Sequence, residues 1–300
     1  MTRNSHGSHL VERAVEAMGN LDGLDMPRPA SKPKPPGIND EHAQASRHEG
    51  PTPASPPAAS STHPVLSLDT LTRAGLVALP TRARGRVSEE ISVVQNQVSR
   101  AMKGAVSSGS QARVALVTSA RPGEGKSFTA LNLAASLATS GAQPVVLVDA
   151  DSKSGSLTHL LGLPDAAGLR IFADNPNLWP NDLLRPTELS QLLFMPYGAP
   201  PPNGPDMPPG AAMAAAIQRL SAALPDHAII VDMPPCLSTS DPSTLAPIAG
   251  QVVMVVEAEC TQRDELEAAL DMVESCPTIQ LLLNKAQLTA SSTFGVYSDA

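Results

Sequence analysis

The feature that most constrains the fold is a short stretch at residues 114–127, which reads VALVTSARPGEGKS. It begins as an apolar run rich in β-branched residues and ends in a glycine-containing turn followed by Lys126 and Ser127. An alanine-rich pattern with helical spacing continues over residues 128–138. Turn amides and a helix N-terminus both carry partial positive charge, so a strand, a turn and a helix in this order attract anions. The stretch therefore predicts a phosphate-binding loop.

The residue types of this loop suit a nucleoside triphosphate and its metal. Lys126 can reach the outer phosphates, and the Ser127 hydroxyl can hold Mg²⁺. The motif usually opens with glycine, and Ala120 stands at that place here. Further residues expected to bind the nucleotide lie in the turn and at the start of the helix: Gly123, Glu124, Gly125 and Phe128.

Composition excludes several other classes of protein. A net charge of −8 argues against a nucleic-acid-binding surface. Three cysteines (Cys236, Cys260 and Cys276), without metal-site spacing, suit a reducing cytoplasm, and we expect Cys236 and Cys276 to be buried. No apolar run approaches the roughly 20 residues of a membrane helix, and no signal core is visible. We expect no direct membrane span, so membrane association would depend on a partner.

The chain divides into four parts by composition. Residues 1–26 form an amphipathic segment, and residues 27–64 form a proline-rich linker that cannot bury enough apolar area to order itself. Residues 65–288 form the folded domain, in which a second proline cluster at 196–210 is expected to be a surface loop; residues 289–300 form a flexible tail. The apolar stripe of the first segment consists of Leu10, Val11, Ala14, Val15 and Met18.

Within the domain, strand-length apolar runs alternate with helical patterns. Strands are predicted at 114–119, 145–149, 192–195, 228–232, 252–257 and 279–284, and helices from Ser88 and at 127–140, 211–224 and 266–273. The strands are continuously apolar rather than alternating, which is typical of a parallel sheet covered on both faces. We therefore predict an α/β fold with a mostly parallel sheet and helices on both faces.

Three aspartates close two of these strands. Asp149 and Asp151 end the run at 145–149, and Asp232 ends the run at 228–232. Ligands of such sheets lie beyond the carboxyl ends of the strands, so these carboxylates should face the loop and help to hold Mg²⁺. Either Asp149 or Asp151 could accept a proton from an attacking hydroxyl, and the sequence does not separate them. Asn284 could bind a purine edge or simply end its strand.

The same motifs resemble those of a known family. SARPGEGKS (119–127), VLVDADSK (146–153) and IIVDMPPCLSTSD (229–241) resemble the Walker A, A′ and B motifs of the bacterial tyrosine kinases, or BY-kinases. SHLVERAVEAMG (8–19), GQVVMVVEAECT and LLLNKAQ resemble the exopolysaccharide-locus autokinases associated with exosortase and PEP-CTERM proteins. The resemblance argues against MinD and ParA relatives, whose loop carries an early extra lysine where Arg121 and Pro122 stand here.

The resemblance implies a P-loop NTPase fold and an ATP-dependent kinase that phosphorylates tyrosines of its own tail, with Mg²⁺ as cofactor. Catalytic roles carry over to Lys126, Asp149, Asp151 and Asp232, and metal binding to Ser127, Asp149 and Asp232. The implied partner is an inner-membrane chain-length-determinant protein, a polysaccharide co-polymerase. The chain would be cytoplasmic, would lie at the inner membrane through that partner, and could form homo-oligomers.

Two departures from the family pattern are visible. The tail carries a single tyrosine, Tyr297, which is the predicted phosphoacceptor, and the other tyrosine, Tyr197, lies in the second proline cluster. In the predicted helix from Ser88, Glu89 and Glu90 are present, but Ser92, Gln95 and Asn96 replace the expected basic residues.

These departures leave three functions open. The first is a tyrosine autokinase acting on Tyr297. The second is a kinase-deficient ATP-binding regulator of an exopolysaccharide export complex. The third is a positioning ATPase of the MinD/ParA type.

Overall fold

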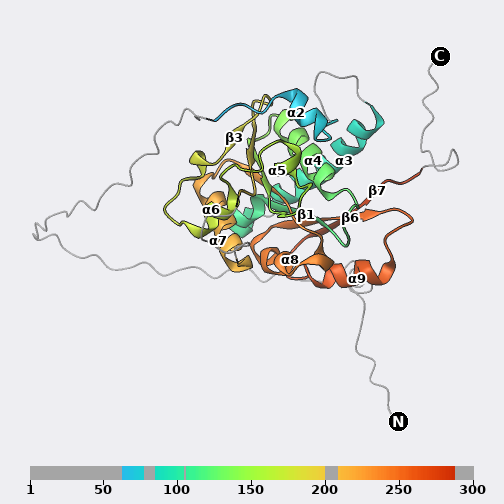
Figure 1. The fold of residues 1–300 in the computed structure, drawn as a ribbon. Helices are drawn as coiled ribbons and strands as arrows, with labels where there is room; N and C mark the ends of the chain where they lie inside the picture. Colours follow the sequence, from blue (N-terminus) through green and yellow to red (C-terminus); the bar gives the residue numbers. More distant parts are fainter. Residues whose placement is uncertain (1–62, 78–84, 105, 200–208, 288–300) are drawn as a thin grey trace, which may run out of the picture. The chain divides into compact units, whose positions relative to one another are not determined.

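The computed structural model of the chain describes residues 63–77, 85–104, 106–199 and 209–287, all within the compact unit Pro56–Ala300. They form a seven-stranded sheet in the order β3-β4-β2-β5-β1-β6-β7, with helices on both faces (Figure 1). Every strand pair is parallel except the short antiparallel pair β3–β4. The predicted fold class is confirmed.

All six predicted strands form. They are β1 (Val114–Ser119), β2 (Val145–Asp149), β4 (Leu192–Met195), β5 (Ala228–Asp232), β6 (Gln251–Glu257) and β7 (Ile279–Asn284). Strand β3 (Arg185–Pro186) was not predicted, because two residues are too few to show a periodic pattern.

The long helices agree with the sequence to within a few residues, and the short ones were not predicted. The long helices are α3 (Arg86–Gly104), α4 (Lys126–Thr139), α7 (Gly210–Ala223) and α9 (Arg263–Asp271). The short ones are α2 (Leu68–Arg73), α5 (Leu157–Leu160), α6 (Leu169–Asp174) and α8 (Asp241–Leu245), with 3₁₀ turns at Val106–Arg113, Pro180–Asp182, Cys236–Ser238 and Ala246–Ile248. Helix α3 begins at Arg86 rather than Ser88, and Arg86 forms an i,i+4 ion pair with Glu90.

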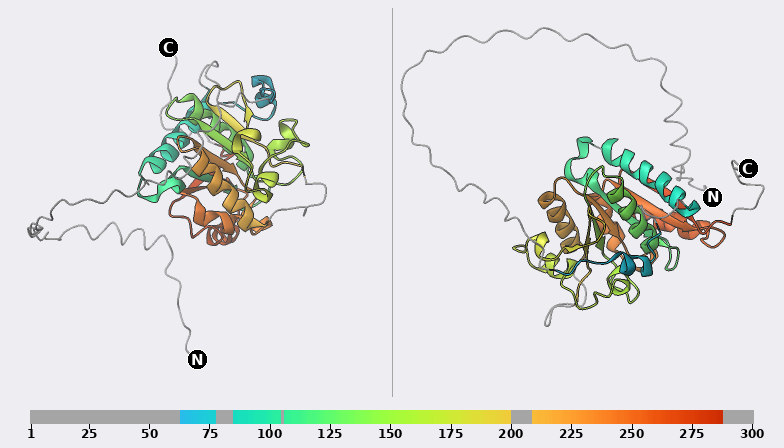
Figure 2. Two further views of the ribbon diagram at one scale, coloured as in Figure 1. Left: turned by 90° about the vertical axis from the view of Figure 1, so that its left-hand side faces the viewer. Right: turned by 90° about the horizontal axis from the view of Figure 1, so that it is seen from above.

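Alternate residues of the inner strands pack into two separate hydrophobic cores, one on each face of the sheet. Val114 and Leu116 of β1 pack with α6, α7, α8 and α9, whereas Ala115 and Val117 pack with α2, α3, α4 and α5. Figure 2 shows these two helical layers on either side of the sheet. The layered arrangement leaves the carboxyl ends of the strands at one edge, where the phosphate loop follows β1.

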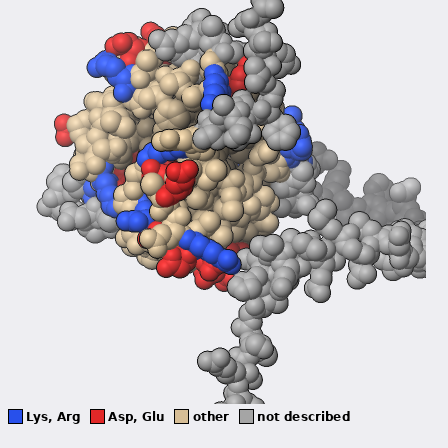
Figure 3. Space-filling model, turned by 90° about the vertical axis from the view of Figure 1, so that its right-hand side faces the viewer, with Lys and Arg blue, Asp and Glu red and all other residues tan. Residues whose placement is uncertain are grey.

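The outer strand β7 departs from the expectation that both faces of the sheet are covered. Leu281 and Leu283 are 58% and 64% exposed, although Leu282 packs against the α3–α4 side. On the side where α3, β7 and α9 lie in Figure 1, acidic and basic side chains are intermingled (Figure 3).

Among the described residues, none of the helices combines the length and the apolar character needed to span a membrane.

Several predictions concern residues outside the described ranges. The N-terminal segment, most of the linker, part of the second proline cluster and the tail with Tyr297 fall there. Tyr197 is described, and it is buried at 5% exposure rather than on a surface loop. Cys236 and Cys276 are buried as predicted, and burial raises the pKa of the Cys236 thiol to about 11.

Candidate active site

The phosphate loop joins β1 to α4 through two glycines in left-handed backbone conformations. Gly123 has φ 91° and Gly125, which caps α4, has φ 97°. A Cβ atom at Gly125 would lie 2.1 Å from Asn284 Nδ2, so glycine is needed for conformation and for space. This local geometry brings the end of β7 against the loop.

Lys126 is the centre of the site. Its Nζ donates to Asp151 Oδ2 at 2.8 Å and to Ser127 Oγ at 3.2 Å, and it lies 4.0 Å from Asp232 Oδ1. The aspartates come together because β2 and β5 are neighbours with Asp149 in register with Asp232. Burial lowers the pKa of Lys126, but the carboxylates of Asp232 and Asp151 outweigh it, so the net pKa is raised.

Asp232 is a buried carboxylate whose charge is only partly offset by Lys126, 4.0 Å away. It is fully buried, and neither carboxylate oxygen has a hydrogen-bond partner among the described residues. Burial raises the pKa of Asp232 to about 7, against the opposing attraction of the Lys126 ammonium. A divalent cation would neutralise the buried charge of the ionised Asp232 carboxylate. Carboxylate and hydroxyl oxygens are ligands that Mg²⁺ accepts. Asp232 and Ser127 therefore fit a Mg²⁺ ion.

Asp149 has a different environment from the other two aspartates. Its Oδ2 accepts from the Thr158 amide at 2.7 Å and its Oδ1 accepts from the Asp151 amide at 3.0 Å. Burial raises the pKa of Asp149, and the hydrogen bonds from Thr158 oppose that rise. Its carboxylate thus holds the turn that carries Asp151. The predicted metal-binding and catalytic roles of Asp149 remain predictions.

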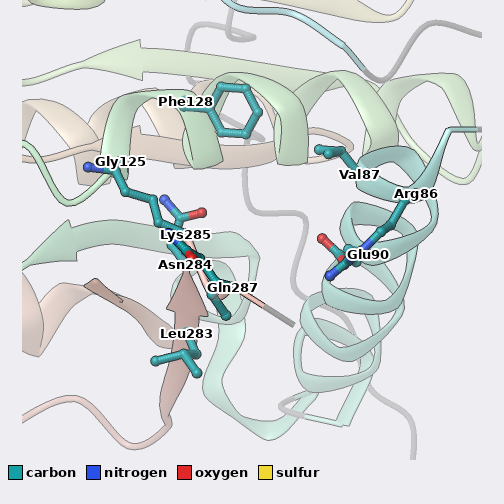
Figure 4. Close-up of a pocket in the computed structure, with 10 residues that line it drawn as sticks. Arg86, Val87, Glu90, Gly125, Phe128, Leu283, Asn284, Lys285 and Gln287 are labelled. Atoms are coloured by element: carbon teal, nitrogen blue, oxygen red, sulfur yellow. The ribbon is translucent and has the colours of Figure 1, made fainter. Parts of the chain in front are cut away.

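Two adjoining hollows surround the loop. The first, of about 310 Å³, is bordered by Lys126, Ser127 and Asp151, and Asp149 is not among its lining residues. The second, of about 700 Å³, lies between α3, α4 and the end of β7, where Figure 4 shows Val87, Phe128 and Asn284. Gly125 and Phe128 line both hollows, so the two lie next to each other. The first has the charges for phosphates, and the second has apolar and amide groups suited to a base.

Glu124 does not direct its carboxylate to the phosphate hollow. It is 3% exposed, and its oxygens accept from the Arg121 amide at 2.7 Å and from the Thr261 hydroxyl. The sequence analysis missed Thr261 and Lys285, which also contact the loop region. The position of Lys285 beside Asn284 was the only feature of the sequence that could have indicated its contact with the loop. No feature of the sequence indicated the contact of Thr261.

In the part of the chain that the structure describes, no group of three or more His, Cys, Asp or Glu side chains could hold a metal by itself. Mg²⁺ commonly binds through one or two protein oxygens together with phosphate oxygens and water. The small protein ligand set found here agrees with a metal that arrives with a nucleotide.

The strand–loop–helix unit, its lysine and the strand-end aspartates define a P-loop NTPase. The ParA family model, described as NUBPL iron-transfer P-loop NTPase, matches residues 110–279, and the chain belongs to this family. The loop sequence argued against MinD and ParA relatives, yet the family model that matches the chain is the ParA model.

Several curated relatives of the chain are named bacterial tyrosine-protein kinases. It is 28% identical over 201 residues to tyrosine-protein kinase CpsD of Streptococcus agalactiae, covering 64% of this chain and 83% of that protein. It is 27% identical over 190 residues to tyrosine-protein kinase YwqD of Bacillus subtilis, covering 62% and 78%. The succinoglycan biosynthesis transport protein ExoP of Rhizobium meliloti is 30% identical over 199 residues, covering 64% of this chain and 24% of ExoP. The predicted resemblance to the BY-kinases is confirmed.

Solved structures support the fold. The chimerical protein CapA2B2 superposes with a TM-score of 0.54 at 23% identity, covering 74% of this chain and 95% of that chain. The kinase domain of Escherichia coli tyrosine kinase ETK gives 0.51 at 23% identity, covering 62% and 72%.

Proposed function

We propose that this chain is an ATP-dependent protein-tyrosine kinase that transfers the γ-phosphoryl group of Mg-ATP to Tyr297 of its own tail. The observation that carries the proposal is Lys126 at the phosphate loop, held between Asp151 at 2.8 Å and Asp232 at 4.0 Å. The kinase names of the curated relatives support this choice among the nucleotide-dependent reactions of the fold.

The residues have separate roles in this reaction. The loop amides and Lys126 bind and orient the phosphates, and the hollow beside Phe128 and Asn284 receives the purine base of the nucleotide. Asp232 and the Ser127 hydroxyl would hold Mg²⁺, which supplies charge neutralisation on the phosphate oxygens.

Asp151 is the better candidate for the catalytic general base because it borders the phosphate hollow. Both oxygens of Asp149, by contrast, accept hydrogen bonds from backbone amides. The tyrosine oxygen forms a bond to the γ-phosphorus while the bond to the β–γ bridging oxygen breaks, and ADP leaves. The hydroxyl proton passes to the Asp151 carboxylate.

The name of one relative supports a proposal about the wider cellular role. Since ExoP is named for succinoglycan transport, we propose that this kinase regulates chain length or export of an exopolysaccharide. Its partner would be an inner-membrane chain-length-determinant protein, which would hold the cytoplasmic kinase at the membrane. Self-association of the chain belongs to the same proposal.

One observation favours a second candidate, an ATP-binding regulator without kinase output. The other of the chain's two tyrosines, Tyr197, is buried, so Tyr297 is left as the single candidate acceptor. In that case nucleotide would bind, and its occupancy alone would be sensed by the partner.

The test is labelling of the purified full chain with γ-labelled ATP and Mg²⁺. The kinase proposal predicts label in the wild type and none in Lys126→Met or Tyr297→Phe. Equal labelling of wild type and Tyr297→Phe would refute the acceptor assignment. Nucleotide binding with no labelling, even with the partner's cytoplasmic segment present, would support the regulator instead.

A further inference from the structure

The phosphate loop is held from outside by a set of contacts that converge on Glu124. This carboxylate bridges the Arg121 amide, within the loop, and the Thr261 hydroxyl, which follows β6. The Thr261 hydroxyl oxygen also accepts from the Glu257 amide, so it is fixed to the end of β6. Glu124 therefore ties the loop to the segment that follows β6, the strand paired with β1.

The end of β7 holds the loop carbonyls. Asn284 Nδ2 donates to the Glu124 carbonyl at 2.9 Å, and Lys285 Nζ donates to the Gly123 carbonyl at 2.8 Å. Lys285 is itself held by Glu257 at 3.0 Å. Figure 4 shows Asn284 and Lys285 lying beside Gly125 at the end of β7.

These two contacts have a consequence for anion binding. A peptide unit is planar, with its N–H opposite its C=O. Holding the carbonyls of Gly123 and Glu124 against β7 therefore turns the amides of Glu124 and Gly125 to the opposite side. Successive amides that converge in this way form an anion-binding nest, and a carbonyl that rotated inward would repel phosphate.

We propose that Glu124 is a positioning residue that sets the phosphate-binding conformation of the loop, acting with Thr261, Asn284 and Lys285. The inference rests on the proposed nucleotide binding and adds residues that touch the loop but not the phosphates. It differs from the sequence-based expectation that Glu124 binds the nucleotide itself.

The direction in which Glu124→Gln changes the Mg-ATP affinity distinguishes a positioning role from a purely electrostatic one. Glu124→Gln removes a negative charge close to bound phosphates, so a purely electrostatic role predicts tighter Mg-ATP binding. A positioning role predicts weaker binding, by about tenfold, since a hydrogen bond to a charged group is lost. Thr261→Val removes the same contact without changing the charge and should weaken binding in the same direction.

The experiment measures Mg-ATP affinity by calorimetry on the full chain, together with the melting temperature of each nucleotide-free variant. Glu267→Gln, on the exposed face of α9, is the matched control that removes a carboxylate away from the loop, and its affinity should equal that of the wild type. Should Glu124→Gln fail to fold, Thr261→Val and Lys285→Met carry the test, with Lys285→Arg expected to restore affinity.

The outcomes are distinct. Weaker binding in Glu124→Gln and Thr261→Val, with nucleotide-free melting temperatures near the wild type, supports positioning. Unchanged or tighter binding in both overturns it. A wild type that binds no Mg-ATP refutes the proposed function, whereas wild-type binding with no response to these variants refutes the positioning role alone.

Discussion

Lys126 and Asp151, 25 residues apart in the chain, form a 2.8 Å salt bridge in which the two side chains are only 11% and 6% exposed. The lysine that would bind the γ-phosphate thus contacts the carboxylate proposed as the general base. A phosphate would compete for Lys126 and leave Asp151 free to accept a proton. In the proposed reaction, this one ion pair would couple nucleotide binding to activation of the general base.

The first prediction concerns Asp151→Asn. Loss of the base should lower the rate of phosphoryl transfer by about 10²- to 10⁴-fold. Mg-ATP affinity should be kept or increased, because the lysine loses its competing partner. Rates of labelling and calorimetric affinities measure the two effects. Asp165→Asn, an exposed aspartate in the same segment, is the control; a wild-type labelling rate in Asp151→Asn would exclude the base role.

The second prediction concerns the pH dependence of stability. Burial raises the pKa of Asp232 to about 7 from its ordinary 3.8, so the folded protein keeps a proton that the unfolded chain releases. This contribution to stability is complete below pH 3.8 and is lost as the pH rises through 7. We expect the free energy of unfolding of the nucleotide-free protein to fall between pH 5.5 and 7, by up to about 1.4 kcal/mol per pH unit.

Urea unfolding at several pH values measures this effect. Asp232→Asn is the matched variant, since it keeps the shape and cannot ionise. Its stability curve should lack the decline, and an identical decline in both proteins would mean that Asp232 is not the group responsible.

A third prediction follows from the same carboxylate. Mg²⁺ needs the ionised form of Asp232, so Mg-nucleotide affinity should fall below pH 7, by up to tenfold per pH unit. Titrations with and without Mg²⁺ separate the metal-dependent part. A pH profile that is equally steep without Mg²⁺ would assign the effect to other groups.

The fourth prediction concerns Gly125→Ala. The substitution forces a left-handed backbone on alanine and brings its Cβ to 2.1 Å from Asn284 Nδ2. We expect a loss of about 1–3 kcal/mol of stability together with loss of nucleotide binding. Gly141→Ala is the control, because it has φ 70° but meets no atom within 4 Å. Gly141→Ala should cost some stability and leave nucleotide affinity unchanged; normal binding by Gly125→Ala would show that the loop tolerates a side chain.

The fifth prediction concerns Tyr197. Burial raises the pKa of its hydroxyl, and the Arg170 guanidinium lies 5.6 Å from its ring centre. Nitration of the native protein should therefore spare Tyr197, and nitration in urea should modify it. Mass spectrometry of the peptides reports both results. Rapid nitration of Tyr197 in the native protein would return it to the list of possible acceptors.

Much of the site could be predicted from sequence because its residues sit at the ends of apolar strands. Asp149, Asp151 and Asp232 were found through β2 and β5, whose parallel register brings them to one edge. The hydrophobic periodicity and the glycine-containing turn were sufficient to predict β1, the phosphate loop and α4.

The remaining features depend on contacts between distant parts of the chain. Thr261 and Glu124 are 137 residues apart, and no local pattern around either residue predicts the hydrogen bond between them. The burial of Tyr197 was missed because its proline-rich neighbourhood is typical of a surface loop. The exposure of Leu281 and Leu283 was missed because an apolar run does not reveal that its strand is at the edge.

The most direct test of the central claim is the occupancy of phosphate at Tyr297, followed by mass spectrometry after Mg-ATP is added to the purified full chain. The account predicts that occupancy rises with time in the wild type and stays at its starting value in Lys126→Met. A wild type that binds Mg-ATP yet gains no phosphate on Tyr297, alone or with the cytoplasmic segment of the proposed membrane partner, would contradict the account.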